Sequence, residues 1–479
     1  MQFLWYDLET FGRDARRSRI AQFAAIRTDE HLRPIETPLS FFCQPSDDIL
    51  PSPGACLITG ITPQQARADG VPEAEFATRI HEEMSRPDTC VAGYNSFRFD
   101  DEFIRHLFYR NFFDPYAREW RNGNSRWDLI DTVRMARALR PDGIQWPLRD
   151  DGAPSFRLEQ LAAANGFVHE RAHEALSDVE ATIALAARLK SEHGRLFDYA
   201  LALRDKRRVA ALLDYAGMTP VLHISQRFPA AQGCGRLVLP VCPHPQIANR
   251  IIVVDLHDDP TPVLELAADE ILDRLYTPRG DLPEGVARIG LKEIHLNRAP
   301  ILVELRHLNP DQLAVFGIDL PRQLDYAARL RAAPNLADKL RAVYGAPRPD
   351  TGRDDPELAL YAGFPAPADA ALFARVRESG GRSPPGGRFG FRDPRYEELA
   401  FRHRARNWPQ ALGPAENARW QQYRSDRLAP GSGLSEYDLA SYRAEILQLR
   451  ATAEPGTGSH AILDALEAWG QEIEASLQG

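Results

Sequence analysis

Residues 1–12 read MQFLWYDLETFG, a hydrophobic run that ends in two acids separated by one residue. Side chains alternate between the two faces of a β-strand, so Asp7 and Glu9 share one face. Two carboxylates this close repel each other unless a cation lies between them, and their hard oxygen atoms suit Mg²⁺ or Mn²⁺. The alternative is a strand that leaves the core and ends in polar residues, and the Asp-x-Glu pattern alone favours that alternative.

Two later segments also place acids where predicted helices begin. In YNSFRFDDEF (94–103), Asp100 lies in the first turn of a helix that follows a predicted buried strand. In AHEALSDVEAT (172–182), His173 precedes Asp178 by five residues, and Asp178 lies just before the apolar stripe of another helix. Taken alone, each acid is equally explained by the favourable interaction of a negative charge with a helix N-terminus, and Asp101 fits that explanation as well as Asp100 does.

Taken together and in this order, the motifs resemble the DEDD exonuclease superfamily, in the branch that carries a histidine. The resemblance implies a ribonuclease-H-like fold and a catalytic site built from five residues. Asp7, Glu9, Asp178 and Asp100 would hold two Mg²⁺ ions, for which Mn²⁺ could substitute, and the ions would clamp the attacking and leaving oxygens of a phosphodiester. His173 would orient and deprotonate the attacking water, because a histidine titrates near neutral pH.

The hydrophobic pattern indicates more than one domain. Three alternating runs within residues 1–45 predict an antiparallel meander, and helices and strands alternate after it. Helices are predicted again at 310–345, the stretch 345–356 has linker composition, and the last helix is predicted with Ser459 as its N-cap. Between them, six β-like runs predict a small barrel or sheet domain: VLHIS (221–225), RLVLPVC (236–242), RIIVVDL (250–256), PVLEL (262–266), EIHLN (293–297) and PILVEL (300–305).

Composition bounds the class of protein. The chain has 479 residues, of which 44% are hydrophobic and 26% charged, as in ordinary globular proteins. No apolar stretch reaches the ~18 residues of a membrane span, and the N-terminus lacks a signal-peptide pattern. We therefore expect no membrane association. Five cysteines without a Cys-x-x-Cys pair argue against a disulfide framework or a zinc site and favour a reducing cytoplasm. The net charge of −9 removes a chain-wide basic signature but is compatible with a local polyanion-binding groove.

A closer resemblance extends over essentially the whole chain. Segments similar to the bacterial exonuclease I family are PGACLITGITPQQARA, FYRNFFDPYA, NSRWDLID, ALRPDGIQWP, DGAPSFRLEQLAAANG, HLNRAP and FRHRARNWP. The implied fold class is α+β multidomain: a ribonuclease-H-like exonuclease domain at 1–192, a Src-homology-3-like β-barrel domain at 193–347 and a helical C-terminal domain at 351–479. The implied function is magnesium-dependent 3′–5′ degradation of single-stranded DNA to 5′-mononucleotides, in DNA repair and recombination.

Aromatic residues and arginines interleave in FYRNFFDPYAREWRNGNSRW (108–127), as expected for a single-strand path that combines base stacking with a positive track. The alternative, buried core aromatics, is favoured for Phe108 and Phe112 but not for Tyr116 and Trp120, which lie among polar residues. By matching motif positions, the resemblance implies these DNA contacts: Glu9, Arg105, Tyr116, Trp120, Arg134, Arg157, Lys206, Asn249, Lys292 and Asn297.

The resemblance also implies a protein partner, the acidic C-terminal tail of single-stranded DNA-binding protein. Matching positions keep Arg140, Tyr199, Leu324 and Arg331. The chain departs from the family at three others, with Thr219 for a lysine, Asn309 for an arginine and Glu304 for a glutamine. Two positive charges are lost and a negative one is gained, so we expect weakened binding of the tail. A monomer is expected from the resemblance.

Two alternatives remain open at this point. A ribonuclease of the same superfamily would share all five catalytic residues, although the large barrel and helical parts count against it. A non-catalytic single-stranded DNA-binding scaffold would have kept the fold and lost the chemistry, and retention of all five residues counts against that.

Overall fold

The computed structural model describes residues 1–167, 174–346, 355–453 and 458–478. By their contacts these residues form two compact units, the first made of 1–125, 169–183 and 350–479, the second of 126–168 and 184–349. No helix in the described ranges is long and apolar enough to cross a membrane. The three predicted domain boundaries stay predictions, and each unit is described by itself.

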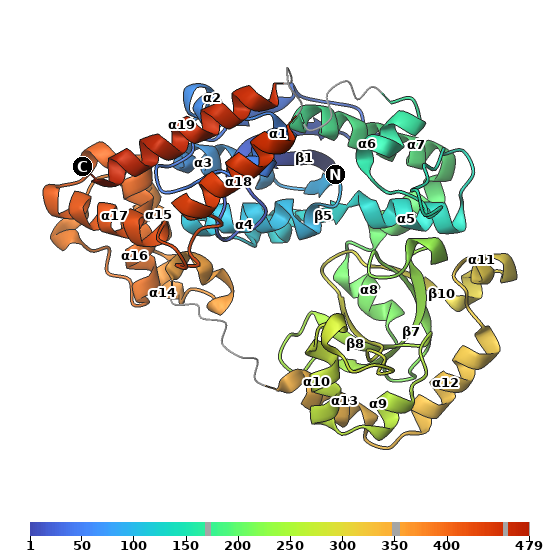
Figure 1. The fold of residues 1–479 in the computed structure, drawn as a ribbon. Coiled ribbons are helices and arrows are strands. Elements are labelled where there is room, and N and C mark those ends of the chain that lie inside the picture. The colour runs from blue at the N-terminus through green and yellow to red at the C-terminus, as the bar shows by residue number, and fades with distance from the viewer. Residues whose placement is uncertain (168–173, 347–354, 454–457, 479) are drawn as a thin grey trace. The chain divides into compact units, whose positions relative to one another are not determined.

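The first unit is built on a mixed sheet with the hydrogen-bonded order β3-β2-β1-β4-β5 (Figure 1). The strands are β1 (Gln2–Thr10), β2 (Ile20–Thr28), β3 (Leu39–Phe42), β4 (Thr89–Gly93) and β5 (Ser125–Asp128), where the chain leaves this unit. β2 is antiparallel to both β1 and β3, so the predicted N-terminal meander is confirmed. β4 runs parallel to β1, the chain having crossed over through helices.

Helices precede and follow the crossover strand in the first unit. They are α1 (Pro53–Thr59), α2 (Pro63–Asp69), α3 (Glu73–Met84), α4 (Asp100–Arg110), the start of α7 (Ala175–Ala202), α14 (Pro367–Ala370), α15 (Phe373–Glu378), α16 (Pro394–Asn407), α17 (Pro414–Arg427), α18 (Leu439–Thr452) and α19 (Ser459–Gln478). Phe76, Ile80 and Met84, which are four residues apart on α3, are buried in one cluster with Leu4 and Leu8 of β1. The helical period therefore fixes which face of α3 meets the sheet.

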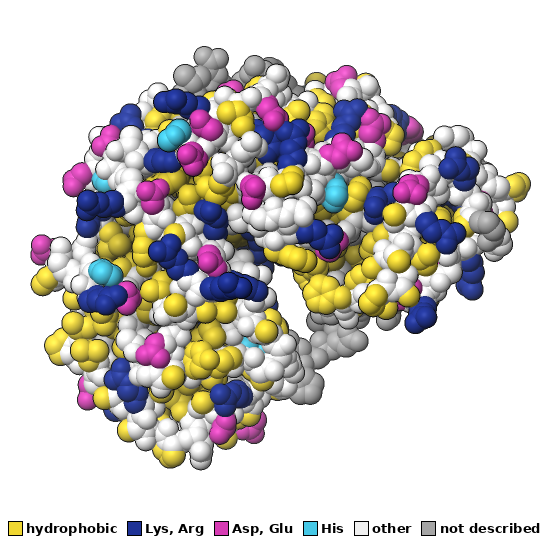
Figure 2. Space-filling view, turned by 180° about the vertical axis from the view of Figure 1, so that it is seen from behind, with side chains coloured by type: hydrophobic (Ala, Val, Ile, Leu, Met, Phe, Trp, Pro, Cys, Tyr) yellow, Lys and Arg dark blue, Asp and Glu magenta, His cyan; other side chains and the backbone are white. Residues whose placement is uncertain are grey.

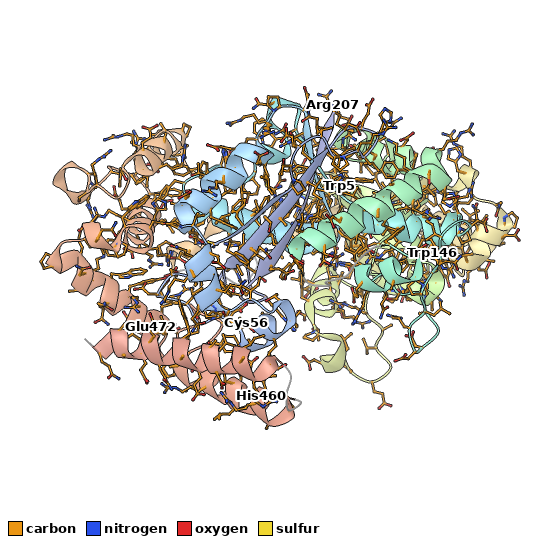
Figure 3. The ribbon with its side chains drawn as sticks, turned by 90° about the horizontal axis from the view of Figure 1, so that it is seen from above. Trp5, Cys56, Trp146, Arg207, His460 and Glu472 are labelled. Atoms are coloured by element: carbon orange, nitrogen blue, oxygen red, sulfur yellow. The ribbon has the colours of Figure 1, made fainter. Side chains whose placement is uncertain are left out.

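The C-terminal helices share a core with the N-terminal sheet. Phe11, Cys56 of α1, Tyr442 of α18 and Trp469 of α19 belong to one buried cluster, and Figure 3 shows Cys56 on α1 beside the helix that carries His460 and Glu472. In Figure 1, α18 and α19 accordingly run alongside α1 and α2, which they contact. Ser459, the predicted N-cap of the last helix, is the first residue of α19, so the helix begins one residue earlier than predicted.

Buried ion pairs reinforce this joint within the first unit. The carboxylate of Glu357, fully buried, accepts from Arg19 at 2.8 Å and from Arg406 at 2.6 Å. Arg406 also pairs with Asp48 at 2.7 Å. Burial alone would raise the pKa of Glu357, but Arg406, Arg19 and two further arginines hold it well below its ordinary value. Chain segments before and after the second unit are thus locked together by charge as well as by apolar packing.

The second unit contains an antiparallel sheet in the order β10-β6-β7-β8-β9. Its strands are β6 (Val221–Ile224), β7 (Gly235–Pro243), β8 (Arg250–Asp255), β9 (Leu291–His295) and β10 (Ile301–Glu304). Its helices are α5 (Leu129–Leu139), α6 (Leu158–Ala164), the rest of α7, α8 (Lys206–Leu212), α9 (Thr261–Glu265), α10 (Ala268–Tyr276), α11 (Pro310–Val315), α12 (Leu320–Ala332) and α13 (Leu336–Gly345).

Five of the six β-like runs predicted in this region form strands, and the prediction for PVLEL was wrong. Residues 262–265 lie in helix α9. Pro262 lies in its first turn, where the missing N–H costs nothing, whereas a proline cannot donate to a sheet ladder. The carboxylate of Asp259 accepts from the backbone N–H of Thr261 at 2.9 Å and satisfies one of the donors at the helix start.

Candidate active site

The two acids of the opening motif lie where β1 outruns its parallel neighbour. β4 pairs with β1 only from Gln2 to Trp5, so Asp7 and Glu9 extend beyond that pairing while β2 still pairs with them. Trp5, on the same face of β1, is fully buried (Figure 3). After β4 the chain turns away at Gly93, where an added Cβ would lie 3.1 Å from the backbone oxygen of Tyr6. The central strand β1 therefore ends in carboxylates at the edge of the sheet formed by the strand ends, beyond its pairing with β4.

Three carboxylates converge at this edge. Asp7, Glu9 and Asp178 each offer an oxygen atom, and these atoms lie within 4.8 Å of one another. Asp178 comes from the first turn of α7, which brings it from a distant part of the sequence. Asp100, the first residue of α4, is buried close enough for its charge to act on Asp7. All four predicted acids thus come from three elements that meet at the tip of β1.

Burial and mutual repulsion perturb the ionisation of this cluster. Burial first, then the charges of Asp100 and Asp178, raise the pKa of Asp7 well above its usual range. Burial, then Asp7 and Asp178, raise the pKa of Glu9 to about 9. Carboxyls that resist ionisation in this way are stabilised as anions when a cation is present. The donor set is all carboxylate oxygen, which fits a hard divalent cation such as Mg²⁺ or Mn²⁺.

The structure separates Asp100 from its neighbour Asp101, which the sequence alone did not. Asp101 accepts from the hydroxyl of Tyr6 at 2.8 Å and from the buried guanidinium of Arg118 at 2.6 Å. Tyr6 points to the face of β1 opposite Asp7, so Asp101 is neutralised behind the sheet edge. This buried Tyr6–Asp101–Arg118 arrangement was not anticipated. The strict alternation along β1 was the only signal for it.

His173, the predicted general base, lies outside the described residues. Its neighbour Glu174 is described, and the oxygen of Glu174 accepts from the backbone N–H of Asp178 at 3.2 Å. Helix α7 begins at Ala175, so Asp178 lies in its first turn.

Besides Glu9 in the carboxylate cluster, three predicted DNA contacts lie in the first unit. Trp120 is 63% exposed, as a stacking residue would be. Tyr116 is half-buried, and burial raises its pKa to about 12. Arg105 is buried, and its guanidinium donates to Glu119 at 2.8 Å and to Glu102 at 2.8 Å while lying 5.3 Å from the ring centroid of Tyr116. Arg105 therefore holds Tyr116 in place.

The remaining predicted DNA contacts lie in the second unit. Arg157, Lys206 and Asn297 are exposed, and Asn249 is half-buried. Lys292 is half-buried, with its ammonium 3.3 Å from the ring centroid of Phe228, and Arg134 is buried beside Asp131. On the face shown in Figure 2, basic and acidic side chains are interspersed, with no broad field of one sign.

The predicted partner-binding residues also lie in the second unit. Arg331 is exposed and donates to the backbone oxygen of Met218 at 2.8 Å. Tyr199 donates to the oxygen of Leu302 at 2.6 Å, Leu324 is 40% exposed, and Arg140 is exposed. Glu304, the added negative charge, accepts from Arg306 at 2.9 Å, which offsets part of that charge.

Comparison with known proteins identifies the family. Family models match in chain order: "Exonuclease" at 4–186, "Exonuclease I SH3-like domain" at 204–346 and "Exonuclease I C-terminal domain" at 354–473. The Exodeoxyribonuclease I of Escherichia coli is 44% identical over 471 residues, which cover 98% of each chain. The chain belongs to the exodeoxyribonuclease I family. Its exonuclease domain, Src-homology-3-like domain and C-terminal domain, with mixed α and β content, confirm the predicted fold class.

Solved structures of exodeoxyribonuclease I show the same fold. E. coli exonuclease I in complex with a dA16 oligonucleotide has a TM-score of 0.94 at 44% identity, covering 98% of this chain and 99% of that one. The zinc-ion-bound form of the E. coli exonuclease–single-stranded DNA complex has a TM-score of 0.93 at 43% identity, covering 99% of each. Because the fold agrees over the whole chain, the cluster of Asp7, Glu9 and Asp178 can be compared with the active site of the family.

Proposed function

We propose that this chain is a divalent-metal-dependent 3′–5′ exonuclease that degrades single-stranded DNA to 5′-mononucleotides, in the service of DNA repair and recombination. The observation that carries the proposal is the convergence of Asp7, Glu9 and Asp178, with ligand oxygens within 4.8 Å of one another, in a chain of the exodeoxyribonuclease I family. Relatives of known structure were solved with single-stranded oligonucleotides and with a zinc ion. Magnesium as the working metal, two ions per site and a cytoplasmic, monomeric protein are parts of this proposal.

The chain's own residues would divide the work. Asp7, Glu9 and Asp178 would hold the metal ions, and Asp100, buried beside Asp7, would add negative charge that favours a high total positive charge in the site. The ions, when bound, would supply charge stabilisation for the phosphodiester undergoing displacement. His173, five residues before Asp178 in the sequence, would take the proton of the attacking water. Trp120 and Tyr116 would hold unpaired bases by stacking, which every base permits.

The test is hydrolysis of an oligonucleotide labelled at either end. Wild-type chain with Mg²⁺ should release labelled mononucleotides at once from a 3′-labelled strand and only late from a 5′-labelled one. Asp178→Asn should reduce the rate by more than about 100-fold, because replacing a residue that merely hydrogen-bonds to a metal ligand already lowers activity by about 10- to 100-fold. Asp198→Asn, an exposed aspartate on the same helix, is the matched control and should leave the rate unchanged. Equal activity of the two variants would contradict the metal-site assignment, and faster cleavage of RNA than of DNA would favour the ribonuclease alternative.

We also propose that Arg140, Tyr199, Leu324 and Arg331 receive the acidic C-terminal tail of single-stranded DNA-binding protein, more weakly than in relatives. Thr219 and Asn309 lack the charge expected there, and charges at the rim of an interface mainly steer association. Calorimetry at low salt with the tail peptide of the same organism should show binding that is lost at high salt. Arg331→Ala should weaken it without changing cleavage of naked DNA, and unaltered binding by that variant would contradict the assignment.

A further inference from the structure

A buried group of three polar side chains adjoins the carboxylate cluster. Asp101 accepts from the hydroxyl of Tyr6 at 2.8 Å and from the guanidinium of Arg118 at 2.6 Å, both at the same oxygen, Oδ1. All three side chains are buried. Tyr6 belongs to β1, Asp101 to α4 and Arg118 to the 3₁₀ turn Ala117–Glu119, so one carboxylate joins three elements of the first unit. We call Tyr6, Asp101 and Arg118 the anchor triad.

Two members of the anchor triad are sequence neighbours of acids in the metal site. Tyr6 directly precedes Asp7 on β1, and Asp101 directly follows Asp100 on α4. Consecutive side chains point to opposite faces of a strand and about 100° apart around a helix, so the triad and the acids leave the same backbone in different directions. The hydrogen bond between Tyr6 and Asp101 therefore fixes the spacing of the two backbone segments that carry Asp7 and Asp100.

The acids of the metal site need such a restraint because they repel one another. Asp100 is buried and close enough for its charge to act on Asp7. A bound cation would offset that repulsion, but the metal-free chain has to keep the acids together by other contacts. The start of α4 offers little help, because Phe99 occupies its N-cap position and has no polar side-chain atom to cap the helix.

Packing and charge hold the anchor triad itself in place. The ring of Tyr6 belongs to the apolar cluster under the sheet and stacks with Phe23 of β2, with the ring centroids 6.2 Å apart. Arg118 supplies the opposite charge that a buried carboxylate such as Asp101 requires. A hydrogen bond to an ionised acceptor is stronger than one between neutral groups, so the bond from Tyr6 is a firm link between β1 and α4.

The anchor triad also connects the metal site with the predicted path of single-stranded DNA. Arg118 lies between Tyr116 and Trp120 in the sequence, two residues from each. Its guanidinium is buried against Asp101, whereas Trp120 is 63% exposed. The segment with the predicted stacking residues is therefore fastened to the helix that begins with Asp100.

We propose that Tyr6 and Arg118 are positioning residues that act through Asp101. They hold the first turn of α4 against β1, which keeps Asp100 at a fixed spacing from Asp7 before a metal ion binds. A site that is already assembled binds its cation without the cost of drawing like charges together, so the triad raises the affinity for metal. This inference rests on the proposed exonuclease function and adds residues that no motif in the sequence pointed to.

Binding of Mg²⁺, measured by calorimetry without DNA, tests the role of Tyr6. Tyr6→Phe removes only the hydroxyl and keeps the ring and the ion pair of Asp101 with Arg118, so the chain should fold. Its Kd for Mg²⁺ should be about 2- to 12-fold higher than that of the wild type, the equivalent of one net hydrogen bond. Cleavage at limiting Mg²⁺ should fall by the same factor and recover at saturating Mg²⁺. The KM for single-stranded DNA should not change.

A matched control separates positioning from stability. Tyr442→Phe removes the hydroxyl of another buried tyrosine, which donates to the backbone oxygen of Leu466 at 3.1 Å in the contact between α18 and α19. Both variants should unfold at a lower temperature than the wild type, because each loses one buried hydrogen bond. Only Tyr6→Phe should bind Mg²⁺ more weakly.

A double variant tests the charged half of the anchor triad. Asp101→Asn combined with Arg118→Gln replaces the ion pair by two neutral amides, so no buried charge is left unpaired. Its Kd for Mg²⁺ should rise by about 10- to 100-fold, the range found when the support of a metal site is removed. If this variant fails to fold, Tyr6→Phe decides alone.

The proposal and the exonuclease function fail in different ways. A Kd for Mg²⁺ less than about twofold above that of the wild type in Tyr6→Phe would overturn the proposal and leave the anchor triad a purely structural role. Failure of the wild-type chain to release mononucleotides would overturn the exonuclease function instead, and the Mg²⁺ titrations would still report on the triad.

Discussion

Adding Mg²⁺ to the metal-free protein should displace protons from the carboxylate cluster. Burial, with the charges of Asp7 and Asp178, raises the pKa of Glu9 to about 9, so this carboxyl is mainly protonated at pH 7 in the metal-free protein. The pKa of Asp7 is also raised, first by burial and then by the charges of Asp100 and Asp178. Carboxylates bind a cation only after deprotonation. We therefore expect the pair to release between about one and about two protons for each chain that binds metal at pH 7.

The pH dependence follows with a definite sign. Between pH 6 and 8 the apparent affinity for Mg²⁺ should rise about tenfold per pH unit for each proton released. For folding, a carboxyl whose pKa is raised from 4.5 to about 9 stabilises the metal-free protein only at low pH. That contribution falls as pH rises through this window, because the unfolded chain loses its proton first. Mg²⁺ should restore stability most strongly at the alkaline end, as thermal unfolding would show.

Calorimetry measures the proton release directly. Mg²⁺ is titrated into the protein at pH 7 in two buffers of different ionisation enthalpy, and the dependence of heat on that enthalpy gives the number of protons. Asp178→Asn removes one of the charges that raise the pKa values of Asp7 and Glu9, so it should release fewer protons. Equal heats in both buffers, or an affinity independent of pH from 6 to 8, would refute the reasoning.

Three further perturbations test other parts of the molecule. Glu357→Gln should lower the free energy of unfolding of the first unit, measured in urea, by about 3–5 kcal/mol, because it removes one partner from a buried ion network. Glu474→Gln, which removes a surface ion pair, should lower it by only about 0–1 kcal/mol. Equal losses in the two variants would contradict a stabilising role for the buried network. Trp120→Ala should weaken single-strand binding by about 1–3 kcal/mol with an unchanged salt slope, and a changed slope would mean that no stack was lost. Arg157→Ala should reduce the salt slope by about 0.7, and an unaltered slope would place Arg157 off the phosphate track.

Short-range periodicity in the sequence was enough to predict much of the fold. Alternation along residues 2–10 places Asp7 and Glu9 on one face of β1, and the pairing with β2 bears this out. The spacing of Phe76 and Ile80 predicts the buried face of α3. These patterns depend only on residues close together in the sequence, so they can be recognised without knowing the tertiary contacts. The run 262–266 was misread because its apolar residues fit both periods and only Pro262 favours the helix.

The tertiary structure decided which side chains are available for chemistry. Asp100 and Asp101 are equivalent as a helix start, but Tyr6 and Arg118 neutralise one of them and leave the other to act on Asp7. Arg105 is a predicted DNA contact, and in the folded chain its guanidinium is buried and pairs with Glu102 and Glu119. The pairing of Tyr116 with Phe364 joins residues far apart in the chain. Motif spacing therefore predicted the four acids that gather at the tip of β1, whereas exposure, charge pairing and the partners of each ring depend on contacts that exist only after folding.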